Sequence, residues 1–184
     1  MDTLGIVESK TIAAGIYLAD AMMKAASVEL VRASTICSGR YLIYVSGDRD
    51  AVATSVNAAL ESGFNLKDSY VISQVSPEML AVLKKDVPVE RVQAMGVIEC
   101  RSVSSGIMAA DTVVKCSDVQ LARFVSGQGI NGKSYFIMSG DVASVEEAAG
   151  AARSVLEKNL VEAVVIPRPD ASVVRVLIKE VGFI

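Results

Sequence analysis

Histidine and tryptophan are both absent from this chain of 184 residues. Histidine is the side chain that most often acts as a general base near neutral pH, and it is a common zinc ligand. Its absence therefore excludes histidine-dependent catalytic triads and most zinc chemistry. Since the sequence shows no metal triad and no nucleophile paired with a base, we expect no enzyme active site.

Features that favour nucleic-acid binding are also scarce. Aromatic residues make up 5% of the chain, which leaves few rings on which bases could stack. The formal net charge is −3, and no run of basic residues is present to neutralise phosphates. The sequence therefore argues against nucleic acid as a partner.

Long hydrophobic runs are missing too. No apolar stretch approaches the roughly 18–20 residues needed to span a bilayer, and the opening MDTLGIVES lacks the basic and apolar segments of a signal peptide. We therefore expect a cytoplasmic protein without a membrane partner. In that compartment the three cysteines Cys37, Cys100 and Cys116, which form no CxxC motif, are not expected to form disulfides.

Hydrophobic residues are nevertheless abundant. They make up 52% of the chain, and the mean hydropathy is +0.44, whereas an ordinary globular chain is roughly 45–50% apolar. A soluble protein of this composition has a large core or buries part of its surface in an oligomer.

A segment of about ninety residues occurs twice, which is the pattern of a tandem repeat. Gly5 and Gly96 stand in the matching runs LGIVE and MGVIE, at an offset of 91 (96 − 5). Gly47 and Gly140 stand in two SGD runs at an offset of 93 (140 − 47), so the second copy has two extra residues between these blocks. Further identities at the first offset are Gly15–Gly106, Ile16–Ile107, Asp20–Asp111, Lys24–Lys115, Val28–Val119, Leu30–Leu121 and Arg32–Arg123. We predict two domains, residues 1–90 and 91–184, joined near the polar DVPVER.

Each copy predicts the element order β-α-β-β-α-β-α, that of an α/β (α+β) ferredoxin-like split βαβ fold with a trailing helix. In the first copy, β-branched runs predict strands over 4–9, 28–34, 41–46 and 70–75, and helical periodicity predicts a helix over 11–26. Asp48 and Asp141 are expected to cap the second helix of each copy, ending near residues 62 and 158. Further start signals are Ser144 and Glu147 in capping-box spacing, and Pro77 and Pro169 opening the last helices.

The ordered motifs resemble the bacterial microcompartment shell domain. The residues that carry the resemblance are the Gly-x-[Val/Ile]-Glu runs at 5–8 and 96–99, the Asp-x-x-x-Lys runs at 20–24 and 111–115, the glycine-bearing hairpin loops, the Gly-Asp-Val pattern and Ile166-Pro167-Arg168-Pro169. The resemblance covers both halves, and it implies a trimer whose six domains mimic a hexameric tile that packs edge to edge with others. Two departures are Asp170, where a histidine is common, and Ser73–Pro77, which replaces the proline motif in the first copy.

The loop TICSGR at 35–40 resembles the pore loop of the iron–sulfur members of this family, from propanediol-utilisation microcompartments. The resemblance implies that Cys37 from each of three subunits holds a [4Fe–4S] cluster on the trimer axis. Such clusters normally take four cysteine thiolates, so one iron would have a non-protein ligand. The alternative is a free thiol in a surface loop, and three such thiols would make the pore sensitive to oxidation.

The second hairpin loop, SGQGING at 126–132, contains a GxGxxG pattern. Because it joins two strands and opens no helix, a dinucleotide-binding role is not expected. Its glycines instead permit close approach of the backbone, and around a three-fold axis this loop would alternate with the cysteine loop. The residues expected to line the opening are Ile36, Cys37, Ser38, Gly39, Gly127, Gln128, Gly129, Ile130 and Asn131.

Lys24 and Lys115 follow an aspartate by four residues, the favourable orientation for a helix-surface ion pair. The resemblance adds a role at the tile edge for both lysines, and it implies that Arg168 reaches the backbone carbonyls of the next tile. The two roles are compatible.

Four further residues are assigned structural roles. Cys100, at the end of a strand, and Cys116, on an apolar helix, are expected to pack in the core. Glu8 and Glu99 lie at equivalent ends of the first strands, which suits a hydrogen-bonding role repeated by the fold.

The resemblance implies a structural shell tile whose central pore holds the cluster and serves electron transfer across the shell. Its partners would be further copies of the chain, other shell proteins and an enclosed redox enzyme or electron carrier. Two alternatives stay open: a metabolite-conducting pore without a cluster, and a soluble ligand-binding or regulatory trimer.

Overall fold

The computed structural model describes residues 3–84, 87, 89 and 92–178. It divides into two compact units that are interleaved in sequence. The first consists of Met1–Val75 with the segments Ser102–Ser105 and Gly127–Gly132, and the second of Ser76–Arg101, Gly106–Ser126 and Lys133–Ile184. The predicted domain boundary between residues 90 and 91 lies outside the described residues, and it stays a prediction.

The predicted element order is confirmed in both copies. The first copy contains β1 (Thr3–Ser9), α1 (Ile12–Ala25), β2 (Glu29–Ile36), a 3₁₀ turn (Cys37–Gly39), β3 (Arg40–Gly47), α2 (Arg49–Leu60), β4 (Leu66–Ser73) and α3 (Pro77–Lys84). The second contains β5 (Ala94–Cys100), α4 (Val103–Cys116), β6 (Gln120–Ser126), β7 (Ser134–Gly140), α5 (Val142–Leu156), a 3₁₀ turn (Glu157–Asn159), β8 (Leu160–Pro167) and α6 (Ala171–Ile178).

Both sheets have four strands and the same topology. Their orders are β2-β3-β1-β4 and β6-β7-β5-β8, and every neighbouring pair is antiparallel. Because β3 lies between β1 and β2, the β1-α1-β2 connection is split by a strand, as the ferredoxin-like prediction requires.

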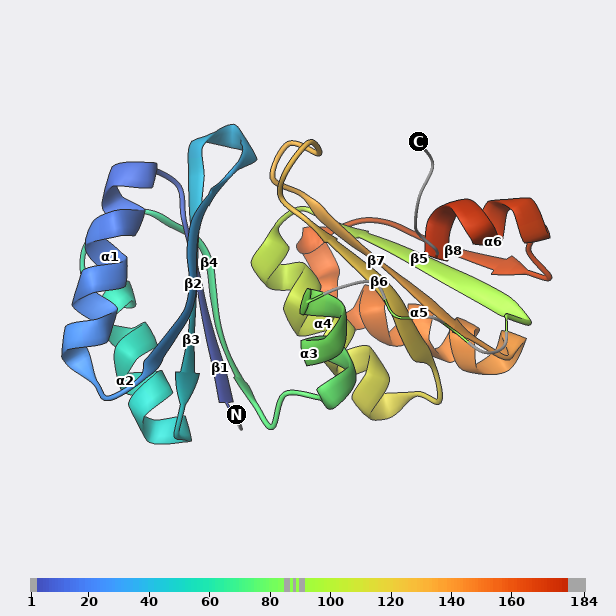
Figure 1. Cartoon of the computed structure of the whole chain (residues 1–184), viewed down its shortest axis with the longest axis horizontal. Coiled ribbons are helices and arrows are strands. Elements are labelled where there is room, and N and C mark those ends of the chain that lie inside the picture. Colours follow the sequence, from blue (N-terminus) through green and yellow to red (C-terminus); the bar gives the residue numbers. More distant parts are fainter. Residues whose placement is uncertain (1–2, 85–86, 88, 90–91, 179–184) are drawn as a thin grey trace. The chain divides into compact units, whose positions relative to one another are not determined.

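Helices α1 and α2 cover one face of the first sheet (Figure 1). The core between them contains Val7 and Ile43 from the strands, Leu18 from α1 and Val52 from α2, all with no exposed surface. Gly5 on β1 lets α2 approach closely, because a Cβ there would lie 2.8 Å from Val52 Cγ1 and from two other valine methyl groups. In the second unit, Met95 and Ile137 of the sheet pack with Ile178 of α6.

Three of the predicted start signals need correction, although α2 and α5 begin where they were expected. Asp48 occupies the N-cap position of α2, but its side chain makes no capping hydrogen bond. Ser144 lies inside α5 and not at its N-cap, so the capping box with Glu147 is wrong: Ser144 N–H donates to Asp141 Oδ1 instead, at 2.8 Å. Helix α6 begins two residues after Pro169, where Asp170 Oδ1 accepts a hydrogen bond from Ser172 N–H at 2.8 Å.

The remaining start signals are confirmed. Pro77 is the first residue of α3, where its missing N–H needs no helical partner, and Asp141 caps α5. Within the described residues, none of the helices is both long enough and apolar enough to span a membrane.

Candidate functional site

The cysteine loop is a tight reversal between β2 and β3 in the first unit. Ser38 and Gly39 both adopt left-handed backbone conformations, with φ of 67° and 66°. Glycine adopts this region freely, whereas for serine it is uncommon. The chain therefore reverses within Cys37–Gly39, and Cys37 is placed at the tip of the hairpin with its side chain partly exposed.

The glycine loop joins β6 and β7, which confirms the predicted hairpin. Gly127, Gly129 and Gly132 have φ of 69°, 76° and 71°, and Asn131 has 55°. Gly127 also meets a close neighbour, because a Cβ at this position would lie 2.8 Å from Ile36 Cγ2. A side chain at Gly127 would therefore separate this loop from the end of β2.

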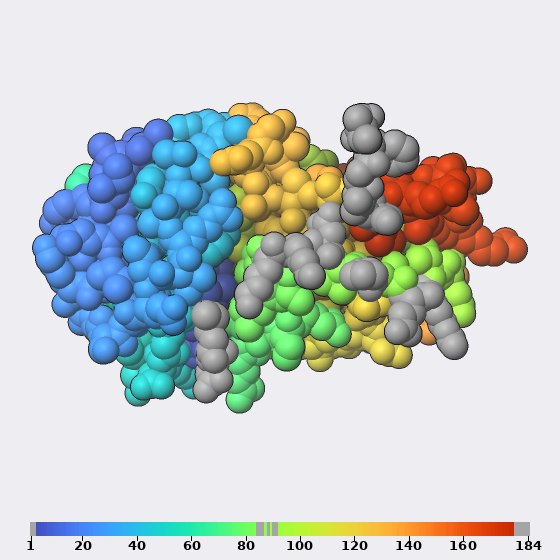
Figure 2. All heavy atoms as spheres, in the orientation of Figure 1, coloured from blue at the N-terminus to red at the C-terminus, as the bar shows by residue number. Residues whose placement is uncertain are grey.

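The two loops are bonded to each other within the first unit, and they lie side by side at its surface (Figure 2). Cys37 N–H donates to the carbonyl oxygen of Gly127 at 3.2 Å, and Gly129 N–H donates to Cys37 Sγ at 3.2 Å. Ser38 Oγ donates to the carbonyl oxygen of Asn131 at 3.3 Å and also to its side-chain oxygen. The sulfur of Cys37 is thus held beside a main-chain donor.

A buried ion pair between Glu8 and Arg40 lies next to the two loops. Arg40 Nη1 donates to Glu8 Oε1, and the Glu8 side chain has no exposed surface. The second Arg40 nitrogen, Nη2, donates to the carbonyl oxygen of Asn131 at 3.1 Å. Glu8 Oε2 accepts hydrogen bonds from Ser104 N–H at 3.1 Å and from Ser104 Oγ at 2.9 Å. Burial raises the pKa of Glu8, and the Ser104 bonds and the Arg40 charge oppose that rise.

Sequence reasoning assigned Glu8 a hydrogen-bonding role but missed its partners. Arg40 stands 32 positions from Glu8 along the chain, and Ser104 stands 96 positions away. The available signal was the position of Arg40 directly after the cysteine turn, in the copy whose first strand carries Glu8 near its end.

The residues predicted to line a pore differ in exposure. Ser38, Gly39, Gln128, Gly129 and Asn131 are exposed, and Cys37 and Ile130 are half-buried. Ile36 and Gly127 are buried, so in this chain they hold the loops together. The arrangement of these residues around an axis stays a prediction.

Cys100 and Cys116 differ in burial. Cys100 is buried as expected, and burial raises the pKa of its thiol to about 12. Cys116 was expected in the core, but it is exposed at the end of α4. Cys116 is the last residue of α4, whereas Val113, one turn earlier on the same side of the helix, is fully buried. In the part of the chain that the structure describes, no three acidic, histidine or cysteine side chains gather into a metal site.

Both lysines predicted at a tile edge pair with the aspartate one turn earlier, but only the Lys24 pair lies on the helix surface as expected. Lys24 Nζ lies 2.6 Å from Asp20 Oδ2. Lys115 pairs with Asp111, whose carboxylate is buried and also accepts a hydrogen bond from Ser76 N–H at 2.7 Å. Arg168 is exposed in a left-handed conformation with φ of 48°, and its N–H donates to the carbonyl oxygen of Gln93 at 2.8 Å. The edge role of these side chains stays a prediction.

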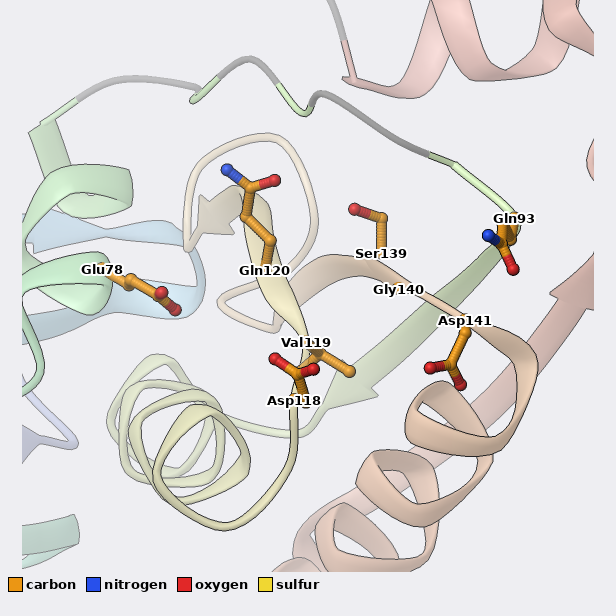
Figure 3. A pocket seen from close by; sticks show the side chains of 8 residues that line it. All are labelled: Glu78, Gln93, Asp118, Val119, Gln120, Ser139, Gly140 and Asp141. Atoms are coloured by element: carbon orange, nitrogen blue, oxygen red, sulfur yellow. The ribbon is translucent and has the colours of Figure 1, made fainter.

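The second unit also contains a polar pocket of about 450 Å³ (Figure 3). Its lining residues are Glu78, Gln93, Asp118, Val119, Gln120, Ser139, Gly140 and Asp141. Partial burial and the nearby charge of Asp118 raise the pKa of Glu78. Sequence reasoning did not find this pocket, because its residues come from separate segments without a characteristic spacing.

Comparisons with known proteins agree with the fold and the repeat. Residues 3–78 and 94–169 each match the BMC domain family. Over 182 residues, which are 96% of this chain and 97% of the relative, the chain is 38% identical to the bacterial microcompartment shell protein PduT of Citrobacter freundii. The shell protein PduA of the same organism is 35% identical over 89 residues, which are 47% of this chain but 96% of PduA.

A solved structure shows the same relationship for the whole chain. A microcompartment protein of Desulfitobacterium hafniense DCB has 39% sequence identity and a TM-score of 0.81, with 95% of this chain and 99% of the other covered. The chain therefore belongs to the BMC domain family, with two copies of the domain in tandem, and the PduT and PduA relatives are shell proteins of bacterial microcompartments.

Proposed function

We propose that this chain is a structural, non-catalytic shell protein of a bacterial microcompartment, and that three copies form a tile with a central pore. The observation that carries the proposal is the joined pair of hairpin loops, which presents Cys37 and six other exposed or half-buried loop residues on one surface of the first unit. Two domains per chain make six domains in a trimer, as in the tandem tiles that the sequence resembles.

Exposed apolar residues on the first domain support assembly with other copies. Ile16 and Tyr17 of α1 are 57% and 58% exposed, and the Tyr17 and Phe64 rings lie 5.4 Å apart between centroids. Exposed apolar side chains that gather in this way favour burial against a partner. Other shell proteins and further copies of the chain are the partners that fit this role.

The finer part of the proposal is a [4Fe–4S] cluster shared by three Cys37 thiolates. Cys37 fits this group because its thiol is partly exposed at a hairpin tip and already accepts a main-chain N–H; hydrogen bonds of this type tune the potentials of iron–sulfur sites. A bound cluster would supply one-electron transfer, and the partners would then include an enclosed redox enzyme or an electron carrier. The loops would hold the thiolates in place.

Anaerobic purification tests the cluster directly. We expect about four iron and four sulfide per trimer, with absorbance near ~400 nm. Cys37→Ser should abolish both iron and absorbance, whereas Cys116→Ser should retain them. A trimer that contains no iron would reject the cluster and leave the metabolite-conducting pore as the function of the opening.

Electron microscopy of concentrated protein tests the tile. We expect two-dimensional sheets, and we expect the double variant Lys24→Ala/Lys115→Ala to lose them while remaining a folded trimer. Sheets that persist in the double variant would reject the edge role of the lysines. Discrete trimers that never form sheets would favour the soluble regulatory protein instead.

A further inference from the structure

The Glu8–Arg40 ion pair contacts both hairpin loops of the first unit at once. Arg40 directly follows the cysteine turn and begins β3, so its backbone belongs to the cysteine loop. Its Nη2 donates to the carbonyl oxygen of Asn131 in the glycine loop at 3.1 Å. The same guanidinium therefore links the carboxylate of β1 to the second loop.

Because this ion pair is buried, polar atoms of the two side chains without a hydrogen-bond partner would destabilise the fold. The Arg40 side chain is 11% exposed and the Glu8 side chain 0%, and buried charges are tolerated only when their polar atoms are bonded. Glu8 meets this condition through Arg40 and Ser104. A glycine loop that moved away would remove the carbonyl acceptor from Arg40 Nη2 and leave a buried donor unpaired.

Close packing adds to the linkage. A Cβ at Gly132 would lie 2.6 Å from Arg40 Cζ, so the backbone of the glycine loop rests directly on the guanidinium. Asn131 accepts from both Arg40 and Ser38. The path from Glu8 through Arg40 and Asn131 thus ends on Ser38, the residue next to Cys37.

Among the described residues of the second repeat, the corresponding ion pair takes a different form. There Lys133 Nζ lies 2.9 Å from Glu99 Oε1, and the two side chains are 40% and 38% exposed. A lysine ammonium is a single point of charge, whereas the planar guanidinium of arginine can donate in two directions from separate nitrogens. The buried, two-directional pair occurs in the copy that carries the loop cysteine.

We propose that Glu8 and Arg40 are positioning residues for Cys37: their buried ion pair fixes the cysteine loop against the glycine loop and so limits the exposure of Cys37 Sγ. The proposed effect on the exposure of Cys37 does not require a bound cluster. The expectation that the ion pair also helps to retain a cluster rests on the proposed function.

The test uses full-length iron-free protein in a Cys116→Ser background, in which Cys37 is the reactive thiol because Cys100 is buried with a raised pKa. The alkylation rate of Cys37 by iodoacetamide is measured by mass spectrometry. Arg40→Lys keeps the charge but cannot reproduce both directed bonds, and we expect it to raise the rate by roughly two- to tenfold. The matched control Lys133→Arg, at the equivalent position of the second repeat, should leave the rate unchanged.

An Arg40→Lys protein that is folded, by circular dichroism, and alkylated at the parent rate would overturn the inference. If Arg40 tolerates no substitution, Ser104→Ala removes one donor to Glu8, and a rate equal to the parent's in that variant would also overturn it. In iron-loaded protein the same variants should retain less iron per trimer. Absence of iron in the parent would reject only the proposed cluster, because the alkylation rates still decide the role of the pair.

Discussion

Lys133 and Glu99 form an ion pair at the positions of the second repeat that correspond to Arg40 and Glu8 in the first. Both repeats therefore place a cation from the start of the third strand, or from the residue before it, beside the glutamate that is the second-last residue of the first strand. They differ in burial and in the cation, since the arginine pair is buried and also reaches the glycine loop. The residues that the two repeats share form the same fold, and the residues that differ give each copy its own burial and contacts.

Substitution by alanine should have opposite effects on stability at two helical glycines. Gly→Ala within a helix normally stabilises by about 1 kcal/mol, and at Gly150 in α5 an added Cβ would meet no atom within 4 Å. At Gly15 in α1 a Cβ would lie 2.6 Å from Tyr41 Cγ. We therefore expect Gly150→Ala to stabilise and Gly15→Ala to destabilise, the latter by about 1–3 kcal/mol. Urea unfolding measures both, and equal stability of the two variants would contradict the packing of α1 on β3.

Replacement of the two capping aspartates, Asp141 and Asp48, should also lower stability to different extents. Asp141 Oδ1 accepts from Ser144 N–H at 2.8 Å, whereas the Asp48 side chain makes no capping bond. We expect Asp141→Ala to lower the midpoint of thermal unfolding by a few degrees and Asp48→Ala to lower it less. Circular dichroism of both variants and the parent measures this.

The pH dependence follows from the same bond. The hydrogen bonds from Ser144 lower the pKa of Asp141 below its ordinary value of 3.8. The ionised carboxylate therefore contributes stability above that value and loses the contribution as the pH falls below it toward the folded-state pKa. The difference between the parent and Asp141→Ala should shrink below pH 3.8. A difference that stayed constant through acidification would exclude the charged cap.

Tyr44 is a buried residue whose hydroxyl has no hydrogen-bond partner among the described residues. Burial raises the pKa of the phenol, which keeps it neutral. An unpaired buried hydroxyl costs about 1–3 kcal/mol, so Tyr44→Phe should raise the free energy of unfolding by about 1 kcal/mol. The Arg32 guanidinium, 5.9 Å from the Tyr44 ring centroid, can keep its contact with phenylalanine. A marked loss of stability would show that the hydroxyl has a partner in the assembled protein.

The order of the elements was predictable from the sequence because it depends on local patterns. Hydrophobic periodicity, turn glycines and Pro77 place the strands and helices to within a few residues, and the repeat doubles each signal. Where a prediction concerned one side chain, it was less reliable. Asp48 and Asp141 stand in the same SGD motif, yet only Asp141 is bonded as a cap.

By itself the sequence determined that the chain is a doubled ferredoxin-like domain with one cysteine-bearing and one glycine-rich hairpin loop. Tertiary structure alone decided that Cys116 is exposed and that Glu8 meets Arg40 and Ser104. The physical reason is that burial and the pairing of charges depend on residues that lie tens of positions apart in sequence. Such residues become neighbours only when strands and loops from distant parts of the chain pack together.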